Sequence, residues 1–497
     1  MMVTLLATIA VGFAATPQDE PPPPAREFRA VWVATVANID WPSKPGLPSL
    51  DAQRELLAIL DQAKGLRLNA VILQVRPTAD ALYASRHEPW SEYLTGQQGQ
   101  PPAPLWDPVE FATAEAHRRG MELHVWINPY RARHPTSKSV IHRAHVSRTK
   151  PHIVRTYGNH LWMDPGEKET QDHSMAVIND LVARYDIDGI HYDDYFYPYK
   201  ERDAKGNLIP FPDDQSYAAY RSRGGRLSRD DWRRNNVDTF VQRIYREVKR
   251  AKPWVKVGIS PFGIYRPNIP EGIAAGVDQY ADLYADARKW LVEGWCDYFT
   301  PQLYWPIAQT KQSYPVLLKW WLQNNPKGRH LWVGNFTSQV GSQFGNWAPE
   351  EIVNQIKVTR ELGAGGNVHF SMRAFTGNFK GLNDLLRGGV YASHAVVPAS
   401  PWIPSRKPAA KPAIQVEQTT PTGDAILRLQ RPADGSQNYL IYTRRAGSWM
   451  LRDLLGVAAT DYAIAGADVR SGVDAVAVST VDRAGNESPR AVLVLRK

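Results

Sequence analysis

Residues 108–129 read PVEFATAEAHRRGMELHVWINP, and they contain one complete helix-to-strand unit. The first half, 108–119, has the apolar spacing of an amphipathic helix and opens with a proline, a residue that suits the first turn. The second half, 122–129, is a short apolar run with β-branched and aromatic residues, which is typical of a buried strand. This stretch therefore predicts one unit of a parallel α/β fold.

The same alternation repeats along most of the chain. The strand candidates are 28–36, 70–76, 122–129, 189–195, 256–263, 298–305, 330–336 and 366–372. Helix-like stretches such as 49–66, 231–251 and 349–362 lie between them. Eight such units in about 360 residues predict a (β/α)8 TIM-type barrel over residues 28–397. The longest loops, 131–167 and 196–229, follow the third and fourth strands, where insertions usually build a substrate cleft.

The composition changes after the barrel. Five prolines with Lys and Arg between them make 398–412 a stiff, exposed linker with few contacts across it. Residues 413–497 alternate apolar and polar positions in short runs, which predicts a small all-β sandwich domain. Within it, residues 477–488, AVSTVDRAGNES, resemble the penultimate strand and following turn of fibronectin type III domains. We expect a spacer or a weak binding module there.

The first residues have the pattern of an export signal. Residues 1–16 form an apolar stretch that ends in small residues, and 17–27 form a proline-rich spacer, although no Lys or Arg precedes the apolar run. We expect a signal peptide and export to the periplasm or cell envelope. The apolar run is too short to span a bilayer, so no transmembrane anchor is predicted.

Composition and charge exclude several function classes. The 497 residues are 43% hydrophobic and 22% charged, as in a globular protein, and the net charge of +9 favours anionic partners. The single cysteine, Cys296, excludes an intrachain disulfide. The 13 histidines show no metal-ligand spacing, and the chain has neither a phosphate loop nor a basic stripe. We therefore expect no metal, no cofactor and no nucleic-acid partner, and the oligomeric state stays open.

Chemistry in a barrel belongs at the carboxyl ends of the strands. The fourth strand ends in DGIHYDDYFYP, residues 188–198, which places Asp193 and Asp194 side by side. Glycoside hydrolysis needs two neighbouring carboxyl groups, one protonated and one ionised. By strand alternation Asp193 faces the barrel interior, whereas Asp194 reaches the cleft only if the strand ends there. We predict both as catalytic; the alternative is that one of them caps a segment or pairs with an arginine.

Polar and aromatic residues follow the other strand ends. The candidate substrate-binding residues are Arg76, Asp80, Trp126, Asn128, Tyr130, Arg131, Asp164, His191, Tyr195, Gln302, Tyr304, Trp305 and Arg373. Flat aromatic rings suit sugar faces. Four arginines, Arg76, Arg131, Arg266 and Arg373, follow strands of the barrel and would surround its mouth. Those that do not pair with aspartates need an anionic ligand, because a buried unpaired guanidinium is costly.

Several segments resemble the bacterial glycosyl-hydrolase-like family 10. The matching segments are FRAVWV (28–33), QVRP (74–77), HRRGMELHVWINPYR (117–131), MDPG (163–166) and DGIHYDDYF (188–196). The resemblance implies an exported barrel enzyme that acts on cell-wall glycan, and some members are described as hydrolases of peptidoglycan strands without stem peptides. It also implies that Asp193 and Asp194 are the acids and that Asp164 and Asn128 lie in the cleft. The chitinase motif D-G-x-D-x-D-x-E is matched less well, because Tyr195 stands where its acidic Glu would be.

The sequence thus predicts a glycoside hydrolase for peptide-free peptidoglycan. Two alternatives stay open. One is a carbohydrate-binding protein without activity, although such a protein would not need to keep two adjacent acids. The other is a lytic enzyme that cleaves the same polymer without water and leaves an anhydro end.

Overall fold

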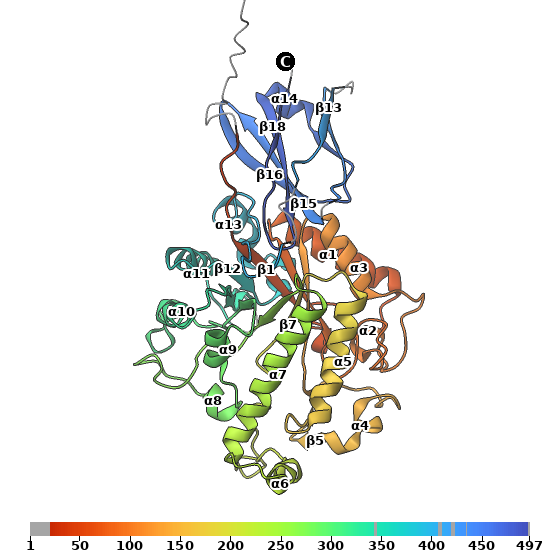
Figure 1. Ribbon diagram of the computed structural model, residues 1–497, viewed down its shortest axis with the longest axis vertical. Helices are drawn as coiled ribbons and strands as arrows, with labels where there is room; N and C mark the ends of the chain where they lie inside the picture. The colour runs from red at the N-terminus through yellow and green to blue at the C-terminus, as the bar shows by residue number, and fades with distance from the viewer. Residues whose placement is uncertain (1–19, 342–344, 406–409, 419–422, 434, 496–497) are drawn as a thin grey trace, which may run out of the picture.

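The larger part of the chain folds into a ring of parallel strands surrounded by helices (Figure 1). The computed structural model describes residues 20–341, 345–405, 410–418, 423–433 and 435–495, so the predicted signal peptide lies outside the described residues. The ring strands are β1 (Phe28–Val33), β2 (Ala70–Arg76), β3 (Glu122–Ile127), β7 (Gly189–Tyr192), β8 (Lys256–Ile259), β9 (Tyr298–Phe299), β10 (His330–Leu331), β11 (Val333–Asn335) and β12 (Gly366–His369). β10 and β11 are the two halves of the seventh predicted strand, interrupted at Trp332. Their order, β10-β9-β8-β7-β3-β2-β1-β12-β11, closes the ring and confirms the predicted barrel.

Helices cover the outside of the ring. They are α1 (Ser49–Gly65), α3 (Pro108–Arg118), α5 (Lys168–Arg184), α7 (Arg229–Ala251), α9 (Ala287–Glu293), α10 (Tyr314–Gln323), α11 (Pro349–Glu361) and α13 (Leu382–Gly388). Side-chain caps begin three of them: the Asp107 carboxylate accepts from the first free backbone N–H groups of α3, Ser228 caps α7, and Asp286 caps α9. Among the described helices, none is both long and apolar enough to cross a membrane.

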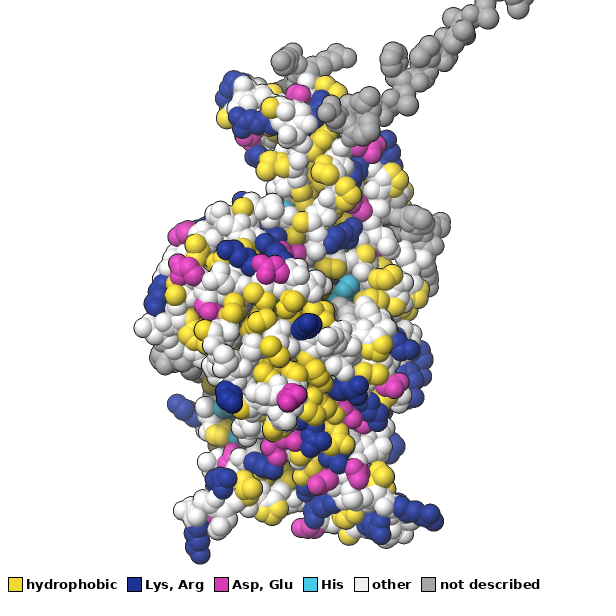
Figure 2. All heavy atoms as spheres, turned by 90° about the vertical axis from the view of Figure 1, so that its left-hand side faces the viewer, with side chains coloured by type: hydrophobic (Ala, Val, Ile, Leu, Met, Phe, Trp, Pro, Cys, Tyr) yellow, Lys and Arg dark blue, Asp and Glu magenta, His cyan; other side chains and the backbone are white. Residues whose placement is uncertain are grey.

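Further helices and strands lie in the loops at the carboxyl ends of the barrel strands. They are α2 (Glu92–Thr95), β4 (Arg131–Arg133), α4 (Val146–Thr149), β5 (Val154–Tyr157), β6 (His160–Met163), α6 (Asp214–Ser222), α8 (Gln279–Asp282) and α12 (Met372–Thr376). β4, β6 and β5 pair into a small antiparallel sheet within the loop after β3. On the face in Figure 2, basic and acidic side chains are interspersed over the molecule.

The barrel strands separate two packed layers. Outward side chains such as Val31, Leu73 and Val125 are buried against the helices. Inward side chains are mostly aromatic or polar, and the rings of Phe28 and Trp332 stack with centroids 3.6 Å apart. The interior is therefore a filled core that supports the cleft at its mouth.

The C-terminal part consists of two antiparallel sheets. The first contains β13 (Ile414–Gln418), β14 (Ala425–Leu429) and β17 (Asp461–Ile464); the second contains β16 (Ser448–Gly456), β15 (Ser436–Arg445), β18 (Val473–Asp482) and β19 (Ala491–Val494), with α14 (Gly466–Arg470) between β17 and β18. Buried residues from both sheets, including Leu427, Tyr439 and Val476, form one apolar core. This confirms an all-β sandwich after the barrel, while the fibronectin type III assignment stays a prediction.

The sandwich packs against the amino-terminal face of the barrel, opposite the loops that carry α4 and α6 (Figure 1). Arg483 pairs with Asp186 at 2.5 Å, just before β7, and Lys64 pairs with Asp453 at 2.6 Å. The first residues of the predicted linker also pack: the Trp402 indole donates to Asp297, before β9. The expectation of few contacts across the boundary is therefore wrong, because proline content describes the stiffness of a segment and not what it touches.

A tight contact between the sandwich and the barrel provides a test of their packing. A Cβ at Gly456 would lie 2.1 Å from the carbonyl oxygen of His117 on α3. We predict that Gly456→Ala lowers the stability by about 1–3 kcal/mol, because neither backbone can move aside. The matched control is Gly276→Ala, since a Cβ at that exposed glycine meets no atom within 4 Å. Thermal melting of both variants makes the comparison, and equal melting temperatures would contradict the docked arrangement.

Candidate active site

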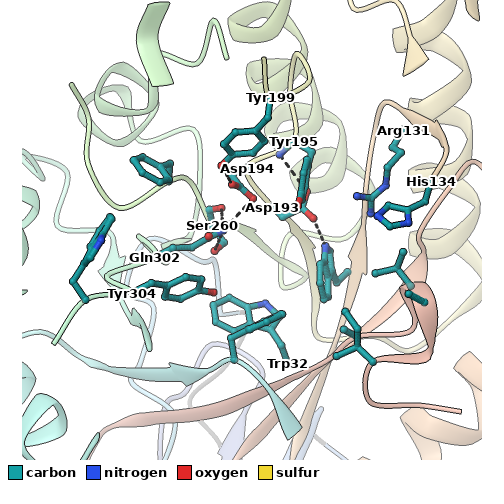
Figure 3. Close-up of a pocket in the computed structure, with 18 residues that line it drawn as sticks. Trp32, Arg131, His134, Asp193, Asp194, Tyr195, Tyr199, Ser260, Gln302 and Tyr304 are labelled. Atoms are coloured by element: carbon teal, nitrogen blue, oxygen red, sulfur yellow. Dashed lines mark hydrogen bonds between the residues drawn. The ribbon is translucent and has the colours of Figure 1, made fainter. Parts of the chain in front are cut away.

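The acidic pair follows directly from the end of β7. Tyr192 is the last residue of this strand that pairs with its neighbours, Ile127 of β3 and Ile259 of β8. Asp193 and Asp194 therefore leave the ladder, which frees Asp194 from strict alternation and lets both carboxyl groups face one cleft (Figure 3). The sequence predicted the strand to extend to residue 195, three residues beyond its observed end.

Each carboxyl group has its own set of hydrogen-bond donors. Asp193 accepts from the Trp126 indole at 3.0 Å and from the Asn128 amide at 3.3 Å. Asp194 accepts from the Tyr199 hydroxyl and from the Gln302 amide, the latter at 3.2 Å. The two acids are thus held by four donors from three segments of the chain.

Burial makes the pair hold a proton near neutral pH. The two residues are 5% and 6% exposed. Burial and the neighbouring Asp194 charge raise the pKa of Asp193 to about 7. Burial also raises the pKa of Asp194, against the opposing effect of the donors Tyr199 and Gln302. The buried pair can therefore hold a proton near neutral pH, with the raised pKa of Asp193 at about 7.

The cleft around the pair has aromatic walls and a volume of about 420 Å³. Its lining comprises Trp32, Ala34, Val36, Ala37, Ile39, Trp126, Arg131, His134, Asp193, Asp194, Tyr195, Tyr199, Ser260, Phe262, Gln302, Tyr304, Trp305 and Phe370. Flat apolar rings with a few convergent polar groups are the usual lining of a sugar-binding cleft. Figure 3 shows Trp32 and Tyr304 on one side of the acidic pair and Arg131 with His134 on another.

Arg131 brings a positive charge into the cleft. Its guanidinium lies over the Tyr195 ring, 4.8 Å from the centroid, and its Nε donates to the Pro77 carbonyl at 3.1 Å. Within the described part of the chain Arg131 forms no ion pair. Burial and Arg131 lower the pKa of the neighbouring His134 to about 4, so this histidine is neutral at physiological pH. The charge of Arg131 borders the cleft and acts to lower the pKa of both Asp193 and Asp194.

Ten of the fifteen residues predicted from sequence meet at this site. Eight line the cleft: Trp126, Arg131, Asp193, Asp194, Tyr195, Gln302, Tyr304 and Trp305. Two more contact residues that line the cleft: Asn128 donates to Asp193, and His191 accepts from the Trp32 indole.

Five predicted residues lie away from the cleft. Arg76 is fully buried in a two-point ion pair with Glu88, and Asp80 is fully buried with donors from Thr78 and Gln98. Tyr130 packs on Phe240 of α7. Asp164 accepts a hydrogen bond from Ser216 and forms an ion pair with Arg155. Arg373 is exposed to solvent beyond β12. Because Arg266 also pairs, with Asp278, the expected ring of four arginines is corrected to Arg131 alone among these four. The partners Glu88 and Asp278 come from loops whose paths no periodicity predicts.

Two important residues were missed from sequence. Trp32 alternates in phase with Phe28 and Ala30, which both face the barrel interior, so strand alternation alone could have placed it there. Tyr199 lies five residues after Asp194 in a loop, and no sequence signal links the two.

A closed barrel whose mouth holds two adjacent, partly protonated acids between aromatic side chains belongs to the class of glycoside hydrolases. Comparisons with known proteins agree. The family model "Glycosyl hydrolase-like 10" matches residues 27–349, and the chain belongs to this family, as its sequence predicted.

Two relatives and one solved structure are similar to the chain. Glycosyl hydrolase YngK of Bacillus subtilis (strain 168) is 42% identical over 410 residues, 80% of this chain and 78% of that protein. Glycosyl hydrolase DigH of Escherichia coli (strain K12) is 33% identical over 352 residues, 66% and 78% of the two chains. The glycoside hydrolase domain of PgaB (BpsB) from Bordetella bronchiseptica is 15% identical, covers 73% of this chain and 98% of its own, and gives a TM-score of 0.49.

The raised pKa of Asp193 predicts the pH dependence of turnover. If Asp193 gives the proton, kcat/KM is high below the pKa and falls as the pH rises through about 7, where Asp193 becomes ionised. At lower pH, activity falls again as Asp194 takes up a proton. The measurement is a pH profile of kcat/KM, and an activity that stays constant from about pH 6 to 9 would contradict this assignment.

Proposed function

We propose that this protein is an exported glycosidase that hydrolyses bacterial cell-wall glycan, specifically peptidoglycan strands from which the stem peptides have been removed. The observation that carries the proposal is the acidic pair in an aromatic cleft that is also lined by Arg131, whose guanidinium forms no ion pair within the described residues. The export part rests on the apolar pattern of residues 1–16. The first residue of protein recovered from the cell envelope tests that part.

The chemistry needs one proton donor and one charge stabiliser. Asp193 gives its proton to the glycosidic oxygen as the bond to the anomeric carbon breaks. Asp194, ionised and held by Tyr199 and Gln302, stabilises the positive charge that develops on the sugar ring. Water then supplies the new hydroxyl at the anomeric carbon, and its remaining proton restores the acid. Mass spectrometry of the product ends tests this step, because a lytic reaction would leave an anhydro end that is one water lighter.

The substrate preference follows from charge. Every second sugar of peptidoglycan carries a lactyl group, whose carboxylate is free when the stem peptide is removed and is masked in an amide when the peptide is present. A guanidinium binds a carboxylate through two parallel hydrogen bonds. Chitin offers no such group. Arg131 therefore favours bare peptidoglycan glycan over both chitin and peptide-bearing strands.

The catalytic assignment predicts the effect of removing either acid. We expect Asp193→Asn and Asp194→Asn each to lower kcat by about 10²-fold or more, because an amide can neither give the proton nor carry the charge. The proteins should stay folded, since both amides keep the shape of the side chain. Steady-state kinetics on purified glycan strands measures the effect, with circular dichroism to check folding. A variant with near-normal kcat removes that residue from the mechanism.

The charge argument predicts a selective effect of Arg131. We expect Arg131→Gln to lower the ratio of kcat/KM on bare peptidoglycan glycan to kcat/KM on chitin oligomers by about 10- to 100-fold, the size of one charge-assisted interaction. The ratio cancels any general effect on the acids. Arg223→Gln, an exposed arginine beyond α6, is the control for net charge. An unchanged ratio in Arg131→Gln would show that Arg131 does not bind a carboxylate.

A further inference from the structure

A chain of four hydrogen bonds runs through the barrel from its amino-terminal face to the cleft. We call the five side chains that form it, Glu122, His124, Tyr298, His191 and Trp32, the interior column. Trp32 Nε1 donates to His191 Nε2 at 3.1 Å, and His191 Nδ1 lies 3.0 Å from the Tyr298 hydroxyl. The same hydroxyl lies 2.8 Å from His124 Nδ1, and His124 Nε2 lies 2.9 Å from a Glu122 oxygen.

The two ends of the column fix the direction of its terminal hydrogen bonds. An indole N–H can only donate, and an ionised carboxylate can only accept. Glu122 is ionised because Lys256, 2.8 Å away, and His124 hold its pKa below the usual value against the effect of burial. At the cleft end, His191 Nε2 must accept from the indole, which leaves Nδ1 of the neutral ring to donate to Tyr298.

Two glycines keep space open for the column. A Cβ at Gly189 would lie 2.4 Å from His124 Nδ1, and a Cβ at Gly258 would lie 1.9 Å from Cζ of Tyr298. Any other residue on these inward positions of β7 and β8 would displace a ring of the column. His124, His191 and Tyr298 are 0% exposed, so the chain maintains a fully buried polar row that apolar side chains could have replaced.

The cleft end of the column is where it can affect the reaction. Trp32 lines the cleft beside Phe370, whose ring centroid lies 6.1 Å from that of the indole, and Figure 3 shows it below the acidic pair. Its Nε1 points away from the cleft to His191, so the ring position is set from inside the barrel. We propose that Trp32 is a sugar-contacting residue of the cleft floor, and that His191, Tyr298, His124 and Glu122 are positioning residues that hold its indole in place.

The column is tested by breaking it in the middle. Tyr298→Phe removes the central hydroxyl but keeps the ring that packs on Trp332 and Phe28. We expect a KM for glycan about 5- to 20-fold higher, with a smaller change in kcat, because the floor of the cleft loses its fixed orientation. The matched control is Tyr192→Phe on β7, which removes a buried hydroxyl that has no hydrogen-bond partner among the described residues. It should keep the wild-type KM.

A double-mutant cycle separates positioning from general destabilisation. Trp32→Phe keeps a ring but removes the N–H that joins it to the column. If the column acts through Trp32, adding Tyr298→Phe to Trp32→Phe raises KM no further; independent effects would multiply. A wild-type KM in Tyr298→Phe, or multiplied effects in the double variant, would overturn the proposal. Should Tyr298→Phe fail to fold, a wild-type KM in Trp32→Phe overturns it from the cleft end.

This inference rests on the glycosidase class of the proposed function and not on the particular glycan. Each variant is therefore compared with the wild type on whichever of bare peptidoglycan glycan and chitin oligomers the wild type cleaves faster. A preference for chitin would defeat the proposed substrate and leave the test of the column intact.

Discussion

Closure of the parallel ring is the constraint on which the rest of the structure depends. β1 pairs with β2 on one side and with β12, more than 300 residues later, on the other. Once these ladders are formed, alternate side chains of every strand must face inward, and all carboxyl ends must meet at one mouth. Trp126, Asp193 and Gln302 come from three separate strand ends, yet Trp126 donates to Asp193 and Gln302 donates to the adjacent Asp194. No local feature of the chain could bring them together without the closed ring.

The interior that closure creates is polar, and its polar groups find different partners at the two ends and in the middle. At the amino-terminal end, Glu122 and Lys256 form an ion pair; in the middle, hydrogen bonds join His124, Tyr298 and His191; at the mouth, two acids share a confined space. Because burial of a charge is costly, the buried ionisable groups at the two ends of the interior either form an ion pair or keep a proton. At the mouth this cost appears as the raised pKa of Asp193, which turns an ordinary carboxylate into an acid near neutral pH.

The two faces of the barrel have different roles. The sandwich and the start of the linker cover the amino-terminal face through Arg483, Lys64 and Trp402, while the enlarged loops and the cleft occupy the opposite face. In such barrels one face usually contributes to stability, and the opposite face carries the catalytic residues. A long polymer can therefore approach the cleft without meeting the sandwich, which supports the barrel from behind.

The sequence alone determined the eight strands, the order of the domains, the family and the acidic pair, because periodicity, composition and motif spacing are local properties of the chain. Tertiary structure decided the contacts of each side chain. Arg76 follows a strand as Arg131 does, but Glu88 in the next loop neutralises Arg76, whereas Arg131 reaches the cleft and forms no ion pair in the part of the chain that the structure describes. Tyr199 reaches Asp194 in the same way, from a loop. Pairing depends on where loops return after the ring closes, and the loop residues carry no period that predicts their path.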